Sequence, residues 1–216
     1  MNLKNYRYFL VSLAIILIDQ AIKLSVHFFM EPGYFGQIEI IGSYFKLHYT
    51  LNPGMAFGIQ LGTIYGKLML TTFRIIAMFG IGYYLFSFTK KQMHAGLLTC
   101  MGLILGGAIG NLIDSIFYGV WFNNAPPNAP MTWFHGQVID MFFFDIWEGI
   151  LPNWVPIWGG SYYSTPIFNF ADAAIFCGVV IFLIFQNKFL EKNDDKLASS
   201  SPAELSKATE EEENFD

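Results

Sequence analysis

Two aspartates lie in apolar surroundings, where an ionised carboxylate is costly to bury. Asp172 opens the apolar segment 168–189, and Asp140 lies within the apolar run 137–144. An acidic residue at the edge of a bilayer-length apolar segment marks a candidate functional site. If two such carboxylates share a proton, one can take a proton from water while the other polarises a peptide carbonyl. This pairing is the chemistry of an aspartyl protease.

The spacing alone leaves a second interpretation open. Asp140 and Asp172 are far apart in the chain, so each carboxylate could instead be held separately by backbone amides or a lysine. Other polar residues repeat one spacing: Asn111 and Asp114 are three positions apart, and so are Asn169 and Asp172. Residues at this spacing share one face of a helix, so each asparagine can reach the same neighbours as its aspartate.

Two further groups of residues could support such a site. Asp19 and Lys23 are four positions apart in the first apolar segment, so they can pair on one helix face or contact a substrate directly. Asn52 comes before Pro53 and Gly54, which is a typical turn sequence. The Asn52 amide can donate hydrogen bonds, and the glycine allows close approach of a backbone.

The composition is that of a membrane protein. The chain is 54% hydrophobic and 13% charged, whereas soluble domains average about 25% charged residues. Four segments reach the length of about 20 residues that a membrane-spanning helix needs, namely 8–29, 68–88, 95–118 and 167–189. We therefore expect an α-helical integral membrane protein with four transmembrane helices. Gly102, Gly106 and Gly110 would let a neighbouring helix approach the third span closely.

The basic residues predict the orientation. Because lysine and arginine are enriched in cytoplasmic segments, we expect both termini in the cytoplasm and residues 31–67 and 119–166 outside. The basic residues that support this orientation are Lys4, Arg7, Lys90, Lys91, Lys188 and Lys192. All five tryptophans lie in the second outer segment, as in an aromatic belt at the membrane interface. The candidate site then lies near the outer face of the membrane.

The outer segments differ in character. Residues 44–49 alternate in polarity after a Gly-Ser pair, which predicts a short β-hairpin or strand pair lying on the membrane. Six of the nine prolines lie between positions 126 and 166, so we expect this region to be irregular rather than helical. The second outer segment contains two long loops, 119–137 and 145–166, and the sequence does not indicate their role.

The C-terminal segment is expected to form a separate part of the chain. Nine of the 17 acidic residues and three of the 12 basic residues lie in 191–216. We therefore divide the chain into a four-span domain, 1–190, and an acidic, disordered cytoplasmic tail, 191–216. No basic surface for nucleic acid is evident. The cysteines and histidines lack metal-ligand spacing, and the motifs of serine hydrolases and zinc proteases are missing.

Five motifs in order make the chain resemble one family, the bacterial lipoprotein signal peptidases (signal peptidase II), which are four-span aspartyl proteases. The resemblance covers roughly residues 8–189. Its motifs are 19–23, 52–57, 107–114, 138–140 and 168–172.

The resemblance implies that Asp140 and Asp172 form the catalytic dyad. The implied substrate is a prolipoprotein whose cysteine carries a diacylglyceryl group, and cleavage just before that cysteine releases the signal peptide. The partners are then this substrate and membrane lipid, with no metal or organic cofactor, and we expect a monomer. The resemblance also implies residues that shape the site, Asn52, Gly54, Asn111, Asn169 and Ala171, and residues that support it, Asp19, Lys23 and Asp114.

One position departs from the family pattern. The family usually has an arginine after the aspartate of the third motif, and this chain has Ser115. Arg74 lies about six residues into the second span, at a depth that suits the site. We predict that it faces the bundle interior and orders Asp114 or the backbone carbonyls of the substrate. The alternative is that Arg74 extends to the outer headgroups.

Two rival functions remain. A small proton-coupled transporter could use Asp19, Asp114, Asp140 and Asp172 as a relay. However, three of these acids map near the outer face, which does not make a path across the membrane. A non-catalytic membrane scaffold would leave the order of the five motifs unexplained.

Overall fold

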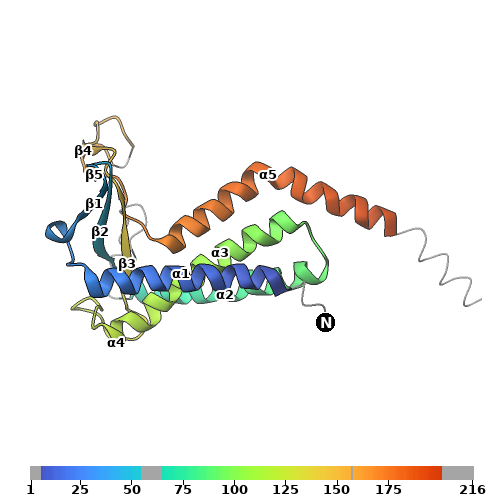
Figure 1. Cartoon of the computed structure of the whole chain (residues 1–216), viewed down its shortest axis with the longest axis horizontal. Coiled ribbons are helices and arrows are strands. Elements are labelled where there is room, and N and C mark those ends of the chain that lie inside the picture. The colour runs from blue at the N-terminus through green and yellow to red at the C-terminus, as the bar shows by residue number, and fades with distance from the viewer. Residues whose placement is uncertain (1–5, 55–64, 157, 201–216) are drawn as a thin grey trace, which may run out of the picture.

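The predicted spans are confirmed by a computed structural model, which describes residues 6–54, 65–156 and 158–200. Among these residues, four helices are long and apolar enough to cross a membrane. They are α1 (Arg7–Phe29), α2 (Gly66–Lys90), α3 (Ala95–Ile113) with its continuation through a π-helical turn η3 (Asp114–Tyr118) and α4 (Gly119–Trp121), and α5 (Phe170–Ser200). Figure 1 shows α1, α2 and α3 close together, and α5 runs beside α3, where a Cβ atom on Gly178 would lie 2.9 Å from the backbone oxygen of Cys100.

Helix α3 is the centre of the bundle, and its glycines allow the close packing that the sequence predicts. A Cβ atom placed on Gly106 would lie 2.8 Å from the backbone oxygen of Ser12 on α1. On another face, a Cβ atom on Gly107 would lie 2.4 Å from the backbone oxygen of Ala171 on α5. Helices α1 and α5 therefore contact α3 at backbone distance, which brings the polar residues of three helices together.

A three-stranded antiparallel sheet lies across one end of the helices (Figure 1). Its strands are β1 (Ile38–Ile41), β2 (Phe45–Asn52) and β3 (Val138–Phe144), in that order. The pair β1–β2 confirms the predicted hairpin. Strand β2 also pairs with β3, so that Thr50 lies opposite Asp140. This register places Asn52 and Asp140 at the same end of the sheet.

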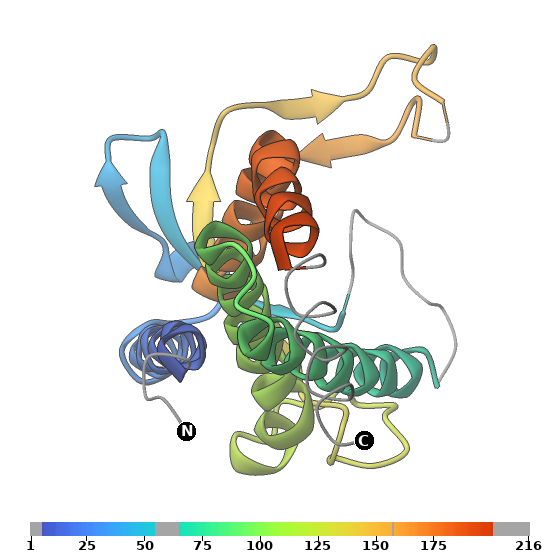
Figure 2. The ribbon, with the colours of Figure 1, turned by 90° about the vertical axis from the view of Figure 1, so that its right-hand side faces the viewer.

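The prediction of an irregular region between residues 126 and 166 was wrong in part. Strand β3 lies within it, as does a second hairpin of β4 (Glu148–Ile150) and β5 (Tyr162–Ser164). The prolines lie between these strands or beside them, while β3 is a run of aromatic and aliphatic residues that favour strands. Figure 2 shows this second hairpin extending away from the helices.

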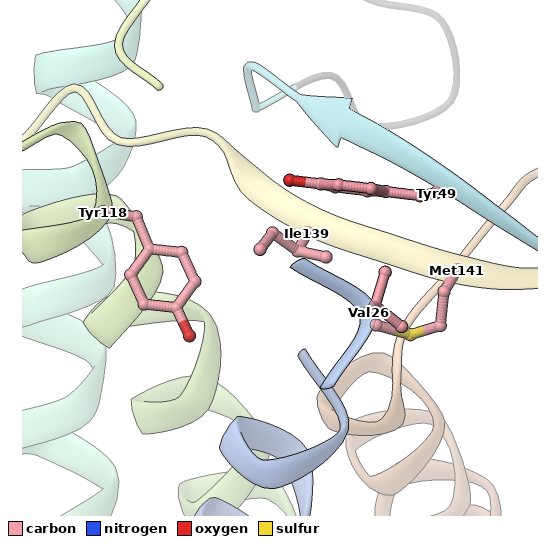
Figure 3. Close-up of a cluster of buried hydrophobic side chains, with 5 residues drawn as sticks. All are labelled: Val26, Tyr49, Tyr118, Ile139 and Met141. Atoms are coloured by element: carbon pink, nitrogen blue, oxygen red, sulfur yellow. The ribbon is translucent and has the colours of Figure 1, made fainter. Parts of the chain in front are cut away.

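A small apolar core fixes the sheet to the helices. Its members come from α1, β2, η3 and β3, and Figure 3 shows them facing one another: Val26, Tyr49, Tyr118, Ile139 and Met141. Ile139 and Met141 are fully buried and flank Asp140 in the sequence. Because successive side chains of a strand point to opposite faces, the packing of these two neighbours turns Asp140 to the other face of β3.

Helix α5 extends further than the expected start of the tail at residue 191. It continues to Ser200 as one helix, and residues 191–200 contain no glycine or proline. The remaining residues of the proposed tail, 201–216, lie outside the described residues.

Candidate active site

Asp140 is buried on β3 and accepts hydrogen bonds from two asparagines. The Asn169 Nδ2 donates to its Oδ1 at 2.6 Å, and the Asn52 Nδ2 donates to its Oδ2 at 3.0 Å. Only 2% of the surface of Asp140 is exposed. The amide of Asn52 is itself oriented by a tight turn, because the Gly54 N–H donates to the Asn52 Oδ1 at 2.8 Å.

Gly54 has the backbone conformation that the turn requires. Its φ of +103° is one that side-chain-bearing residues rarely adopt. This explains the glycine of the second motif. The rest of that motif, residues 55–57, lies outside the described residues.

Asp172 lies in the first turn of α5, where Asn169 caps the helix. The Asp172 N–H donates to the Asn169 Oδ1 at 2.9 Å, and the Asn169 N–H donates to the Asp172 Oδ2 at 3.5 Å. This reciprocal arrangement is a capping box made from asparagine and aspartate. The three-residue spacing seen in the sequence is therefore that of a helix cap. The positive end of the helix dipole also favours a carboxylate here.

Asn111 joins the two aspartates into one hydrogen-bond network. Its Nδ2 donates to the Asp172 Oδ1 at 2.7 Å, and its Oδ1 accepts from the Asn169 Nδ2 at 3.1 Å. The network therefore runs from Asp140 through Asn169 and Asn111 to Asp172. Of the two aspartates, Asp140 is buried, whereas Asp172 is partly exposed.

Lys23 lies beneath this network and bonds two acids. Its Nζ is 2.9 Å from the Asp19 Oδ2 and 2.8 Å from the Asp114 Oδ2, and all three side chains are fully buried. The predicted pairing of Asp19 with Lys23 is confirmed. Lys23 also donates to the Asn111 Oδ1 at 2.9 Å, so one cation connects the buried acids to the network around Asp172.

The buried acids in turn hold the backbone segments that carry the two aspartates. The Asp19 Oδ1 accepts the Ala171 N–H at 2.9 Å, and the Asp114 Oδ2 accepts the Ile139 N–H at 3.3 Å. Each acceptor therefore fixes the residue immediately before one of the two aspartates. Ala171 is fully buried against α3, where a larger side chain would not fit. Asp19 and Asp114 are thus bonded to the backbone segments that carry the two aspartates.

Comparisons with known proteins identify the family of this chain. A family model described as signal peptidase (SPase) II matches residues 11–188. The chain belongs to the signal peptidase II family. Relatives include the lipoprotein signal peptidase of Amoebophilus asiaticus (strain 5a2), 47% identical over 213 residues, with 97% of this chain and 86% of the relative covered. Another is the lipoprotein signal peptidase of Porphyromonas gingivalis (strain ATCC BAA-308 / W83), which is 42% identical over 182 residues, with 79% of this chain and 78% of the relative covered.

Solved structures show the same fold. A bacterial membrane enzyme determined by the in meso method is 23% identical, with a TM-score of 0.55 over 84% of this chain and 88% of that one. Family membership makes the chain a peptidase that processes lipoproteins, and with its four apolar helices it is a multi-pass protein of the inner membrane. The transporter alternative receives no support.

In this signal peptidase, the surroundings of Asp140 favour its protonated form. Burial and the negative charge of Asp172 together raise the pKa of Asp140 to about 7, although the hydrogen bonds from Asn52 and Asn169 act in the opposite direction. The Asp140 carboxyl is therefore neutral in a large fraction of molecules near neutral pH. A neutral carboxyl can donate a proton or a hydrogen bond, which an ionised one cannot.

Arg74 faces the interior of the bundle, as predicted. Its Nη1 donates to the Ser115 Oγ at 2.8 Å, so it does not extend to the lipid headgroups. Its partner is Ser115 and not Asp114, because Lys23 already bonds Asp114. The arginine expected at position 115 is thus replaced in space by one that comes from α2.

Sequence analysis missed three residues of the site. Lys67 is buried on α2, with its Nζ 3.5 Å from the Ser115 Oγ. Its seven-residue spacing from Arg74 places both on one helix face, which was the available signal. The other two are Gln20 and Tyr118: the Gln20 Nε2 donates to the Asp114 Oδ1 at 3.0 Å, and the Tyr118 hydroxyl donates to the Gln20 Oε1 at 2.9 Å.

The described residues offer no site for a metal ion, since they contain no group of three histidine, cysteine or acidic side chains that could hold one.

Proposed function

We propose that the chain is an aspartyl endopeptidase that cleaves prolipoproteins just before the diacylglyceryl-modified cysteine, with Asp140 and Asp172 as its catalytic dyad. The observation that carries this proposal is the network that links a buried aspartate to a partly exposed one through Asn169 and Asn111. Burial favours the neutral form of Asp140, which suits it to be the acid and leaves the role of base to the partly exposed Asp172.

The reaction follows from these two environments. Asp172 takes a proton from a water molecule, while the neutral carboxyl of Asp140 donates a hydrogen bond to the scissile carbonyl oxygen. The water oxygen bonds to the carbonyl carbon. The carbon–nitrogen bond then breaks as Asp172 passes the proton that it took from the water to the amine nitrogen. This gives the signal peptide a new carboxyl end and the lipoprotein a free amino end, and it returns Asp172 to its ionised form.

The residues around the dyad have separate roles in this proposal. Asn52 and Asn169 orient Asp140, and Asn111 orients Asp172. Gly54 and Ala171 supply the backbone geometry that these contacts need. The supporting groups Asp19, Lys23 and Asp114 fix the segments that carry the dyad. Because every one of these residues comes from one chain, a monomer is sufficient for activity.

The test is cleavage of a diacylglyceryl-prolipoprotein by purified variants in detergent. We expect Asp140→Asn and Asp172→Asn each to abolish cleavage while the protein stays monodisperse with an unchanged helix content. Asp145→Asn is the matched control, because Asp145 is an aspartate of the outer region that pairs with Lys46 outside the network. Wild-type turnover in either dyad variant would reject the assignment.

We also propose that both termini are cytoplasmic and that the dyad lies near the outer face. The start of α1, the link between α2 and α3 and the end of α5 all lie away from the sheet (Figure 1), and basic residues flank that end of the helices. A signal peptide that spans the bilayer can then enter sideways from the lipid and present its cleavage point beneath the sheet.

Labelling with an impermeant thiol reagent tests this orientation. In a variant without Cys100 and Cys177, a cysteine at the exposed position Asn128 should react in cells whose outer barrier is opened, and one at Lys90 should not. The reverse pattern would invert the topology. We further propose that residues 191–216 are dispensable for catalysis, so that truncation after Lys192 keeps the turnover of the purified enzyme.

A further inference from the structure

Two cations of α2, the buried Lys67 and the partly buried Arg74, make no salt bridge with a carboxylate among the described residues. Lys67 and Arg74 are on one face of α2, and both reach the Ser115 Oγ, at 3.5 Å and 2.8 Å. The salt bridges among the described residues involve only Lys23 and Lys46. Asp114 and Asp140 attract both cations, and Asp172 attracts Arg74, but none of these acids bonds Lys67 or Arg74 directly. A neutral hydroxyl offsets little of the cost of burying positive charge, so both cations can still bond a negatively charged group of a ligand.

The position of the two cations relates them to both aspartates. Ser115 donates from its Oγ to the backbone oxygen of Asn111 at 3.0 Å, so Arg74 lies one helical turn from the side chain that orients Asp172. A Cβ atom on Gly54 would lie 3.6 Å from the Lys67 Nζ, so Lys67 lies against the turn that orients the Asn52 amide toward Asp140. The cations thus lie next to the two segments that hold the dyad.

We propose that Lys67 and Arg74 bind the carboxylate that hydrolysis creates at the end of the released signal peptide. This inference rests on the proposed function. Before cleavage the scissile group is a neutral amide. After the carbon–nitrogen bond breaks, the water oxygen has become part of a carboxyl group, which loses its proton and carries a full negative charge.

The charge of the ligand decides between the amide and the product. Hydrogen bonds to charged groups are about twice as strong as those between neutral groups, so a full charge offsets the burial of two cations better than a neutral carbonyl does. Arg74 can also bind a carboxylate through two parallel bonds. The same site therefore distinguishes the product end of the signal peptide from an uncleaved peptide, and it draws developing negative charge away from the dyad.

The experiment compares two synthetic peptides with the sequence of the C-terminal half of a lipoprotein signal peptide, one ending in a free carboxylate and one in a carboxamide. Binding to the intact enzyme is measured by fluorescence anisotropy in phospholipid-free detergent at pH 6, where both cations and the peptide carboxylate are charged. We expect the carboxylate peptide to bind roughly tenfold more tightly to the wild type. In Lys67→Met and in Arg74→Gln the ratio should fall below about threefold, while carboxamide binding stays nearly constant. Equal binding of the two peptides to the wild type would overturn the proposal.

The controls separate loss of charge from loss of structure. Arg74→Lys should keep most of the preference, and Lys91→Met, which removes an exposed cation at the other end of α2, should keep all of it. If the neutral variants do not fold, inhibition of the wild type decides: the carboxylate peptide should inhibit roughly tenfold more strongly than the carboxamide. A preference that survives in a folded Lys67→Met/Arg74→Gln double variant would contradict the proposal.

A phospholipid phosphate offers similar anionic oxygens, so a further arm distinguishes the two sources. Phosphatidylglycerol added to the micelles should leave the carboxylate preference unchanged, as should phosphatidylcholine. If phosphatidylglycerol alone removes the preference, the site binds a lipid phosphate and the proposal fails. Since binding is measured with product peptides and needs no turnover, failure here is distinct from failure of the dyad, which would appear as cleavage by Asp140→Asn.

Discussion

The Nδ2 of Asn169 lies 2.6 Å from the Oδ1 of Asp140. The same side chain uses its Oδ1 to cap α5 at the N–H of Asp172. One asparagine therefore sets the position of both aspartates, although they come from a strand and a helix that are far apart in the chain. A residue that orients two catalytic groups is expected to affect turnover more than substrate affinity.

We expect Asn169→Ala to lower kcat by roughly 10–100-fold, since a hydrogen bond to a charged or acidic group contributes about 1.5–3 kcal/mol. The kcat of Asn169→Ser should lie between those of the wild type and Asn169→Ala, because serine can still cap the helix but cannot reach Asp140. The rate of prolipoprotein cleavage is the measurement. Asn153→Ala serves as the control, because Asn153 is exposed in the link between β4 and β5. An Asn169→Ala enzyme with unchanged kcat would show that the network does not position the dyad.

The pH dependence of kcat/KM should report the protonation of Asp140. Its pKa is raised to about 7 by burial and by the charge of Asp172, so the neutral carboxyl prevails below this pH and is lost as the pH rises. We therefore expect kcat/KM to decline above pH 7, measured between pH 6 and 9, with an apparent value that belongs to the coupled pair.

The Asn52→Ala variant tests in which direction the decline of kcat/KM moves along the pH axis. The hydrogen bond from Asn52 lowers the pKa of Asp140 because it stabilises the ionised form. Its removal should shift the decline in kcat/KM to higher pH, even though the absolute rate is lower. A shift to lower pH would mean that Asp140 does not act as the proton donor.

The sequence predicted the spans and the components of the site because these depend on local patterns. Apolar length defines the helices, and the spacing of Asn169 and Asp172 is that of a helix cap. Strand β3 was not predicted, since the prolines around it dominated a local interpretation and its pairing with β2 is a long-range contact. The second acid bonded by Lys23 was missed for the same reason: Asp114 comes from another helix, and helical spacing indicates only Asp19.

Lys23 should be essential for folding as well as for the site. Its removal in Lys23→Met leaves Asp19 and Asp114 buried without a counter-ion, which typically costs about 3–5 kcal/mol. We expect a lower thermal midpoint in detergent, and partial recovery when Asp114→Asn is added, because one uncompensated charge is then removed. Lys46→Met is the control, since Lys46 pairs with Asp145 outside the bundle, where both side chains are partly exposed and removal of one partner leaves the other in reach of water. Equal midpoints for the Lys23 and Lys46 variants would contradict this account.

The contact between α3 and α5 should limit activity through a position that touches no substrate. A Cβ atom on Gly107 would lie 2.4 Å from the backbone oxygen of Ala171, the residue before Asp172. The added Cβ atom would meet a backbone atom, which cannot rotate away as a side chain can. Gly107→Ala must therefore displace the start of α5. A displacement of about 1 Å at a catalytic group can lower the rate by roughly 100-fold, so we expect a large loss of kcat in a protein that remains helical.

The matched control for this change is Gly80→Ala in α2, because a Cβ atom there meets nothing within 4 Å. Alanine is the better helix former by up to about 1 kcal/mol, so Gly80→Ala should keep full activity and a thermal midpoint that is equal or higher. The two variants add the same methyl group to helical glycines and differ in what that group meets. Full activity in Gly107→Ala would show that α5 can move at its N-terminus without disturbing Asp172. The position of the dyad would then depend on the Asn169 and Asn111 side chains alone.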